Sequence, residues 1–225
     1  MTTRHIWQQK LPSITHNNGV YNIDNVRDFR WQDENTAMEA RYLVGDIAID
    51  DIKECVLYQS LFGVLPWFSR MFAHYMLWFV MQKWDRKHEI IVSIEARRPA
   101  GKGYSLRKGI VPHMYGQIII RGTPEDLLGL RTDVRHEPVT RFPLNLTQEQ
   151  SHNVFRYIAR RTNRLVSHPH GYSALTNNCI TDLHYCLYRA LRTTASSAVH
   201  KLPRFALASL WPTRYVNMLK RHGIL

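Results

Sequence analysis

The chain has 225 residues, of which 44% are hydrophobic, so it can bury the core of one generous domain and is too apolar for a disordered protein. Thirty Lys and Arg residues against eighteen Asp and Glu residues give a formal net charge of +12. This excess predicts an anionic partner, namely nucleic acid, an acidic membrane surface or an acidic polymer, although the same charge would also serve solubility alone.

The cysteines and histidines exclude a disulfide scaffold and a zinc finger. There are three cysteines, Cys55, Cys179 and Cys186, and none of the twelve histidines has zinc-finger spacing. Cys179 and Cys186 are seven residues apart, which on one helix separates their Cα atoms by about 10 Å. That distance is too long for a disulfide bond.

Neither the N-terminal segment nor the most apolar segment of the chain has the sequence of a signal peptide or a membrane-spanning helix. Residues 1–18 lack the apolar core of a signal peptide. The most apolar segment, residues 55–81, is interrupted by Pro66, Arg70 and His74, whereas a spanning helix needs about twenty largely apolar residues. We expect this segment to be packed core, and the compartment stays open.

In chain order, residues 1–20 are expected to be an irregular lead-in. Residues 21–31 look like a short strand followed by a loop, and residues 47–62 mix strand-like and helical patterns that cannot be separated. We expect residues 21–192 to form the main domain, with residues 193–225 as a basic helical C-terminal extension packed on it.

The clearest local prediction is a hairpin. Residues 71–81 and 88–98 are rich in strand formers and flank the polar segment QKWDRK. With the turn centred between Trp84 and Asp85, the numbers of paired residues sum to 169, so His74 lies opposite Glu95. Directly opposed side chains have Cβ atoms about 5 Å apart, close enough for a carboxylate to hold an imidazole. A shift of one residue would place the two side chains on opposite faces.

Helices are expected in the second half of the chain, after a strand over residues 115–122. Thr123 is a good N-cap with proline following it, and Thr147 with Gln150 has the spacing of a capping box. Together with the hairpin, these segments predict an α+β fold in which an antiparallel sheet packs against helices.

The stretch YSALTNNCITDLHYCL raises the possibility of a nucleophilic cysteine. Asn178 is a good N-cap, which puts Cys179 in the first turn of a helix, where the dipole favours a thiolate and predicts a depressed pKa. Free backbone N–H groups there would bind an oxyanion, with His74 as base and Glu95 as its orienting partner. The alternatives are a small buried hydrophobe at Cys179, a core histidine at His74 and an ion-paired surface carboxylate at Glu95.

Five motifs in this order resemble the Lnb N-terminal periplasmic domain family, which is named after a bacterial lipoprotein N-acyltransferase: NVRDF, AHYMLWF, SIEARRPAGKGYS, LLGLRTDVR with FPL, and YSALTNNC. The resemblance covers residues 21–192. It implies a circularly permuted papain-like cysteine-enzyme fold and a periplasmic or cell-envelope location. Carried over to this chain, it implies these site residues: His74, Glu95 and Cys179 as catalytic groups, with Asn177, Asn178, Tyr172 and Arg97 supporting them or binding substrate.

The function predicted from these observations is cysteine-dependent acyl transfer, as an amide or ester hydrolase or an N-acyltransferase. The substrate would bear an amide or ester, in a lipoprotein, a lipid or a cell-wall peptide, and the chemistry requires no metal and no organic cofactor. The alternatives are a non-catalytic binding module that uses a basic helix over residues 156–164, and a degenerate papain-like scaffold. Nucleic acid is the least favoured partner, because no nucleic-acid-binding motif accompanies the arginines.

Overall fold

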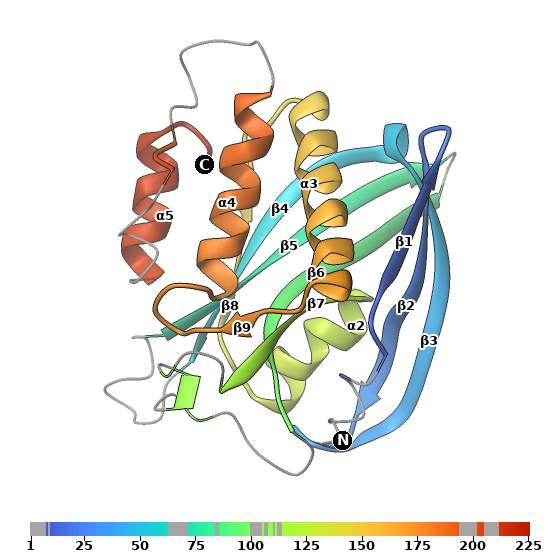
Figure 1. Ribbon diagram of the computed structural model, residues 1–225, viewed down its shortest axis with the longest axis vertical. Helices are drawn as coiled ribbons and strands as arrows, with labels where there is room; N and C mark the ends of the chain where they lie inside the picture. Colours follow the sequence, from blue (N-terminus) through green and yellow to red (C-terminus); the bar gives the residue numbers. More distant parts are fainter. Residues whose placement is uncertain are drawn as a thin grey trace.

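One large, mostly antiparallel sheet organises the α+β fold (Figure 1). The computed structural model describes residues 8, 10–62, 72–83, 86–99, 105, 108–109, 111, 114–193, 202–204 and 212–225. The strands are β1 (Ser13–Asn17), β2 (Val20–Trp31), β3 (Ala37–Ala48), β4 (Ile52–Phe62), β5 (Phe72–Lys83), β6 (Arg86–Arg97), β7 (Tyr115–Gly122), β8 (Val139–Pro143) and β9 (Gly171–Tyr172). The helices are α2 (Pro124–Leu127), α3 (Gln148–Ser167), α4 (Cys179–Arg192) and α5 (Pro212–Arg221).

The strands follow the order β1-β2-β7-β6-β5-β4-β8, with β3 paired to β2 and β9 paired to β7. The β2–β7 contact is parallel and consists of the Arg27–Gly122 pair. Gly122 allows this close approach, since a Cβ there would lie 3.0 Å from the Arg27 carbonyl oxygen and 3.0 Å from Leu127 Cγ.

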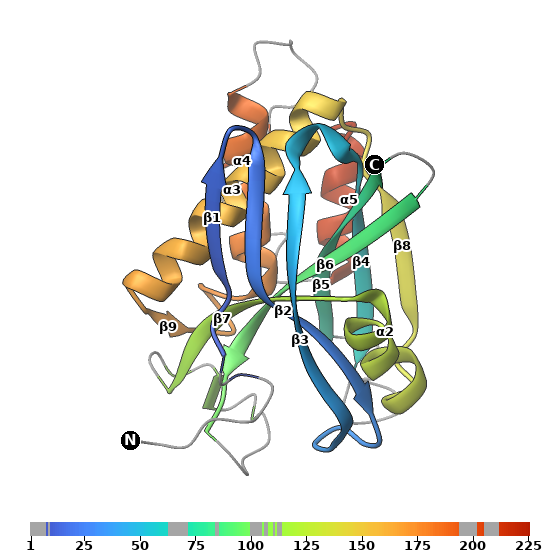
Figure 2. The same ribbon diagram turned by 90° about the vertical axis from the view of Figure 1, so that its right-hand side faces the viewer.

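Alternate side chains of the central strands face two different cores. Leu57 and Leu77 belong to the larger core, which lies between the sheet and helices α3, α4 and α5. Val56 and Met76, their neighbours in sequence, belong to a second core on the other face that includes Leu127 of α2. Figures 1 and 2 show the three long helices side by side on one face. The period-2 alternation of the strands therefore decides which face each candidate site residue occupies.

The N-terminal part of the sheet differs from the prediction. Residues 13–17, expected within an irregular lead-in, form β1, and the whole of residues 20–31 is strand, not a short strand and a loop. The two strands are joined by Asn18 and Gly19, which both have positive φ (47° and 79°). An Asn-Gly pair is the strongest sequence signal for such a two-residue hairpin turn, and this signal explains the difference.

The helix starts follow the predicted caps. Thr123 caps α2, which is followed by a π-helical turn at Leu130–Val134. Thr147 and Gln150 form the capping box of α3, and Asn178 caps α4. Local side-chain chemistry at these positions therefore marks where each helix begins.

The predicted hairpin register is confirmed. Strands β5 and β6 pair from Lys83–Arg86 to Met76–Ser93, and each pair sums to 169. The turn residues Trp84 and Asp85, residues 63–71 of the apolar segment and the glycine-rich loop over residues 100–104 lie outside the described residues.

Among the helices that the structure describes, none combines the length and the apolar composition of a membrane-spanning segment.

A buried ion pair joins β2 to α2. The Asp126 carboxylate accepts hydrogen bonds from Arg27 Nε at 2.7 Å and Arg27 Nη2 at 2.9 Å, and also from Trp31 Nε1 and the Phe29 backbone N–H. The Arg27 and Asp126 side chains are 2% and 0% exposed. Because one buried carboxylate of α2 accepts from three residues of β2, it fixes α2 on the sheet.

We predict that Asp126→Ala lowers the free energy of unfolding by about 3–5 kcal/mol, because it leaves the Arg27 charge buried without its carboxylate. Glu39→Ala removes the partner of an exposed arginine, Arg41, and should cost less than about 1 kcal/mol. Urea unfolding of both variants and the wild type tests this. Equal losses in the two variants would show that the buried pair contributes nothing beyond a surface pair.

Candidate active site

Strands β5 and β6 separate from each other in the middle of the sheet. Their ladder ends at Met76–Ser93, whereas β5 continues its pairing with β4 to Phe72, and β6 continues its pairing with β7 to Arg97. Four residues of each strand therefore lie beyond the last β5–β6 pair while staying paired on their outer sides. This separation opens the sheet at one end.

A pocket of about 740 Å³ lies at this opening. Its lining includes His74 from β5, Glu95 from β6, Arg131 and Glu137 from the segment after α2, and Cys179 from α4. By strand alternation His74 lies on the face of Met76, which is opposite to the face covered by α4. The separation of β5 and β6 thus brings groups from both faces of the sheet into one cavity.

A hydrogen-bonded chain holds the imidazole of His74. Its Nε2 lies 2.7 Å from Ser93 Oγ, and the Ser93 hydroxyl donates to Glu95 Oε1 at 3.0 Å. Because the single hydroxyl proton of Ser93 goes to Glu95, Ser93 Oγ must accept from His74 Nε2–H. This chain assigns the Nε2–H tautomer to His74 and leaves Nδ1 as its basic nitrogen.

Glu95 was predicted to contact His74 directly, and the structure instead places Ser93 between them. Register and face were predicted correctly, but the ladder ends at Met76–Ser93, so His74 and Glu95 do not pair and His74 contacts Ser93 instead. Ser93 sits two residues before Glu95 on the same face, and side chains offset by two residues remain within reach of one another. The two-residue spacing between Ser93 and Glu95 could therefore have identified Ser93 as a site residue from the sequence.

Arg131 is the fixed cation of the site. Its Nη1 donates to Glu137 Oε2 at 3.0 Å, and its Nη2 lies 3.7 Å from Glu95 Oε1, with 7% of the side chain exposed. Ser60 of β4 also donates to Glu137. The arginine lies in the π-helical turn, an irregularity that is frequent at functional sites. The sequence did not predict Arg131 as a site residue.

Burial and nearby charges set the protonation states of His74 and Glu95. Burial lowers the pKa of His74 well below its ordinary value, and the charge of Arg131 adds to this, so the imidazole is neutral near pH 7. Burial disfavours ionisation of Glu95, but His74, Arg131 and other cationic groups outweigh it and lower its pKa to about 2. With His74 neutral, Arg131, Arg27 and Arg135 are the permanent charges that keep Glu95 ionised, and Arg131 has the largest effect of the three.

Cys179 is the first residue of α4 and is 4% exposed. The predicted depression of its pKa is wrong, because burial raises the pKa of the Cys179 thiol to about 11. The backbone N–H groups of Tyr75 and Ile180 and the charge of Arg131 oppose this rise. Burial also raises the pKa of Cys186, to about 12, and that of Cys55 further still. All three thiols are free.

The N-cap of α4 restricts the oxyanion donors that the sequence suggested. The Asn178 side chain accepts from the backbone N–H groups of Ile180 at 2.9 Å and Thr181 at 3.0 Å. Within the part of the chain that the structure describes, the Cys179 N–H is the first-turn amide that this cap leaves open. The expectation of several free donors therefore reduces to one.

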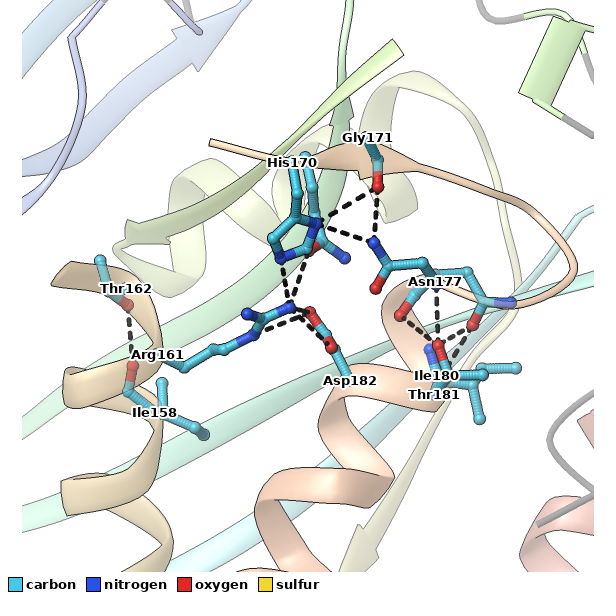
Figure 3. A network of polar contacts seen from close by, with 11 residues as sticks. Ile158, Arg161, Thr162, His170, Gly171, Asn177, Ile180, Thr181 and Asp182 are labelled. Carbon is cyan, nitrogen blue, oxygen red and sulfur yellow. Dashed lines mark hydrogen bonds and ion pairs between the residues drawn. The ribbon is translucent and has the colours of Figure 1, made fainter. Parts of the chain in front are cut away.

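A polar network fixes the loop that leads into Cys179 (Figure 3). Arg161 of α3 donates to Asp182 of α4 at 2.9 Å and to His170 Nε2 at 2.5 Å. Asn177 Nδ2 donates to the Gly171 carbonyl at 2.5 Å and lies 2.9 Å from His170 Nδ1. Because a guanidinium only donates, His170 Nε2 accepts, so Nδ1 carries the proton and donates it to the Gly171 carbonyl at 3.3 Å. The Asn177 Nδ2 group also only donates, so the Gly171 carbonyl, not His170 Nδ1, accepts its hydrogen bond. The loop is thus tied to both helices.

The supporting residues predicted from the resemblance divide into two groups. Tyr172 of β9 lines the pocket. Asn178 and Asn177 instead hold the backbone before Cys179, and Arg97 donates to the Gln8 carbonyl at 3.2 Å, with its neighbour Arg98 lining the pocket. Among the described residues, no group of three or more His, Cys, Asp or Glu side chains is arranged to hold a metal ion.

We predict that Arg161→Met lowers the free energy of unfolding by about 1.5–3 kcal/mol, since it removes charge-assisted hydrogen bonds to Asp182. It should also speed amide hydrogen exchange at Ile180 and Thr181, because the preceding loop loses its anchor. Arg160→Met, one position earlier and exposed, is the matched control and should stay within about 0.5 kcal/mol of the wild type. Unchanged exchange in Arg161→Met would show that the network does not hold the loop.

The family model of the Lnb N-terminal periplasmic domain matches residues 48–219, which include His74, Ser93, Glu95, Arg131 and Cys179. Searches of curated proteins and of solved structures find no significant match. The match covers about three quarters of the chain, and the chain therefore belongs to the Lnb N-terminal periplasmic domain family.

Proposed function

We propose that this protein is a cysteine-dependent acyl-transfer enzyme of the bacterial periplasm, with a permuted papain-like arrangement of its site. The observation that carries the proposal is the chain from Glu95 through Ser93 to His74, which leaves His74 Nδ1 unprotonated in a pocket that also holds Cys179. A base with its orienting partner, in the same pocket as a thiol at a helix start, is the constellation that nucleophilic catalysis requires.

In this mechanism the thiol is neutral at rest and is activated only when substrate is bound. Cys179 transfers its proton to His74 Nδ1 as the sulfur attacks the carbonyl carbon of an amide or ester. The imidazolium is stabilised through Ser93 by the Glu95 carboxylate, which stays ionised because of Arg131. The Cys179 N–H and the dipole of α4 face the oxygen that gains negative charge.

Collapse of the tetrahedral intermediate breaks the bond to the leaving amine or alcohol, which takes the proton from His74. The acyl group is then a thioester on Cys179. Water or an acceptor amine, deprotonated by His74, attacks the thioester and restores the free thiol. Attack by water makes the protein a hydrolase, and attack by an amine makes it an acyltransferase. Cys179, His74, Ser93 and Glu95 have the same roles in both reactions.

The pocket walls suit a substrate with both apolar and charged parts. Leu61, Phe62 and Ala73 contribute apolar surface, whereas Arg131 and Arg135 lie on the charged side. A lipoprotein, a lipid or a cell-wall peptide bearing an amide or ester would present both kinds of surface. The family's periplasmic description supports a cell-envelope substrate over a cytoplasmic one.

Site-resolved alkylation tests the nucleophile. We predict that iodoacetamide labels Cys179 faster than Cys55 and Cys186, because its thiol lines the pocket and its pKa is raised least. Labelling should rise about tenfold per pH unit below the pKa of about 11, since only the thiolate reacts. Peptide mass spectrometry from pH 6 to 10 measures this. The nucleophile is misassigned if Cys186 reacts as fast as Cys179.

Turnover of an activated ester tests the catalytic chain. With p-nitrophenyl acetate, the wild type should release a burst of one nitrophenolate per chain and leave acetyl on Cys179. Cys179→Ala should abolish the burst, and His74→Ala should slow acylation by about 10²–10⁴-fold through loss of the base. Ser93→Ala should slow acylation by a smaller factor, on the order of tenfold, because Nδ1 remains while its tautomer is no longer fixed.

The same assay separates catalysis from the non-catalytic alternatives. Cys186→Ala is the matched control, since Cys186 lies on the same helix and outside the pocket lining. A binding module or a degenerate scaffold would give no acetyl-Cys179 and identical slow hydrolysis in the wild type and all four variants. That result would overturn the proposal.

A further inference from the structure

The positive charge of the chain is concentrated in its last third. Eleven of the thirty Lys and Arg residues follow Glu149, but only one of the eighteen acidic residues does, Asp182. Residues 150–225 therefore contribute +10 to the formal charge of +12, and the rest of the chain is nearly neutral. These residues include α3, α4 and α5, which lie together on one face of the sheet (Figures 1 and 2).

Arginine and tyrosine side chains lie near one another on α3 and α4. We call the set Tyr157, Arg160, Tyr185, Arg189 and Arg192 the arginine–tyrosine face. The three arginines are exposed, and Tyr185 is 41% exposed. The one acidic side chain of this part of the chain, Asp182, is 10% exposed and bound by Arg161, so it does not neutralise the face.

Two like charges are held over one ring on this face. The guanidinium carbons of Arg160 and Arg189 lie 5.7 Å and 5.9 Å from the ring centre of Tyr157. Arg192, which is exposed about one turn further along α4, donates to the Tyr188 hydroxyl at 2.6 Å. The tyrosines position the arginines, but they do not cancel the mutual repulsion of their charges. A bound anion would relieve that repulsion.

We propose that the arginine–tyrosine face docks on the anionic headgroups of a phospholipid bilayer. The face lies on the outside of packed helices, and it combines arginine with tyrosine, a residue enriched at membrane interfaces. Basic residues near an anionic surface add to membrane affinity, and phospholipid headgroups are the extended anionic surface available to a periplasmic family. Nucleic acid is the competing polyanion, and the periplasmic family disfavours it. The proposal is independent of the thiol chemistry proposed above.

Vesicle binding by the full chain tests the proposal. The wild type should co-sediment with phosphatidylcholine vesicles that contain 30% phosphatidylglycerol in 0.1 M NaCl, and should be released in 0.5 M NaCl because salt screens the attraction. Each arginine near such a surface is worth roughly fivefold in partitioning, so the triple variant Arg160→Gln, Arg189→Gln, Arg192→Gln should bind at least about tenfold more weakly. Pure phosphatidylcholine vesicles should bind neither protein.

The matched control removes the same charge from the strands. Arg41→Gln, Lys53→Gln, Arg141→Gln changes three exposed residues of β3, β4 and β8 and should weaken binding less than about threefold. Cys179→Ala should bind like the wild type. Equal weakening by the two triple variants, or equal binding of neutral vesicles, would overturn the proposal. So would full displacement from vesicles by a DNA duplex at equal phosphate concentration, because the partner would then be nucleic acid.

Discussion

The site depends on the early end of the β5–β6 ladder. A continuous sheet would separate His74 and Glu95, on one face, from Cys179 of α4, on the other. Where the two strands part, the Tyr75 backbone N–H is close enough to affect the thiol of Cys179, and the pocket reaches both faces. The strands can part because each keeps its outer partner, β4 or β7, so the sheet loses few hydrogen bonds at this point.

Electrostatics at the opening follows from burial more than from helix position. The α4 dipole and two backbone donors favour the Cys179 thiolate, yet the cost of a buried charge exceeds them. The same burial keeps His74 neutral, while Arg131 keeps Glu95 ionised. His74 and Cys179 are therefore uncharged near neutral pH, whereas Glu95, which is linked to His74 through Ser93, is ionised.

Sequence alone predicted what depends on neighbouring residues. The caps at Thr123, Thr147 and Asn178 were predictable because they involve donors within three positions, and the β5–β6 register followed from the centre of one turn. Strand β1 was equally predictable from Asn18-Gly19, and that signal was missed. The role of Arg131 was not predictable, because it depends on an irregular turn being packed against a strand 36 positions earlier in the chain.

The uneven charge distribution reflects different contributions of the strands and of the helices in residues 150–225. The strands and the segment after α2 supply the acidic and basic groups that pair within the pocket, and their formal charges nearly cancel. The helices supply Cys179 and the arginine–tyrosine face, whose arginines form no ion pair with any carboxylate among the residues that the structure describes. Helix α4 contributes to the pocket and to the arginine–tyrosine face: its first turn lines the pocket, and its last turns carry arginines of the face. A surface bound by that face would therefore hold the pocket at a fixed distance, set by the length of one helix.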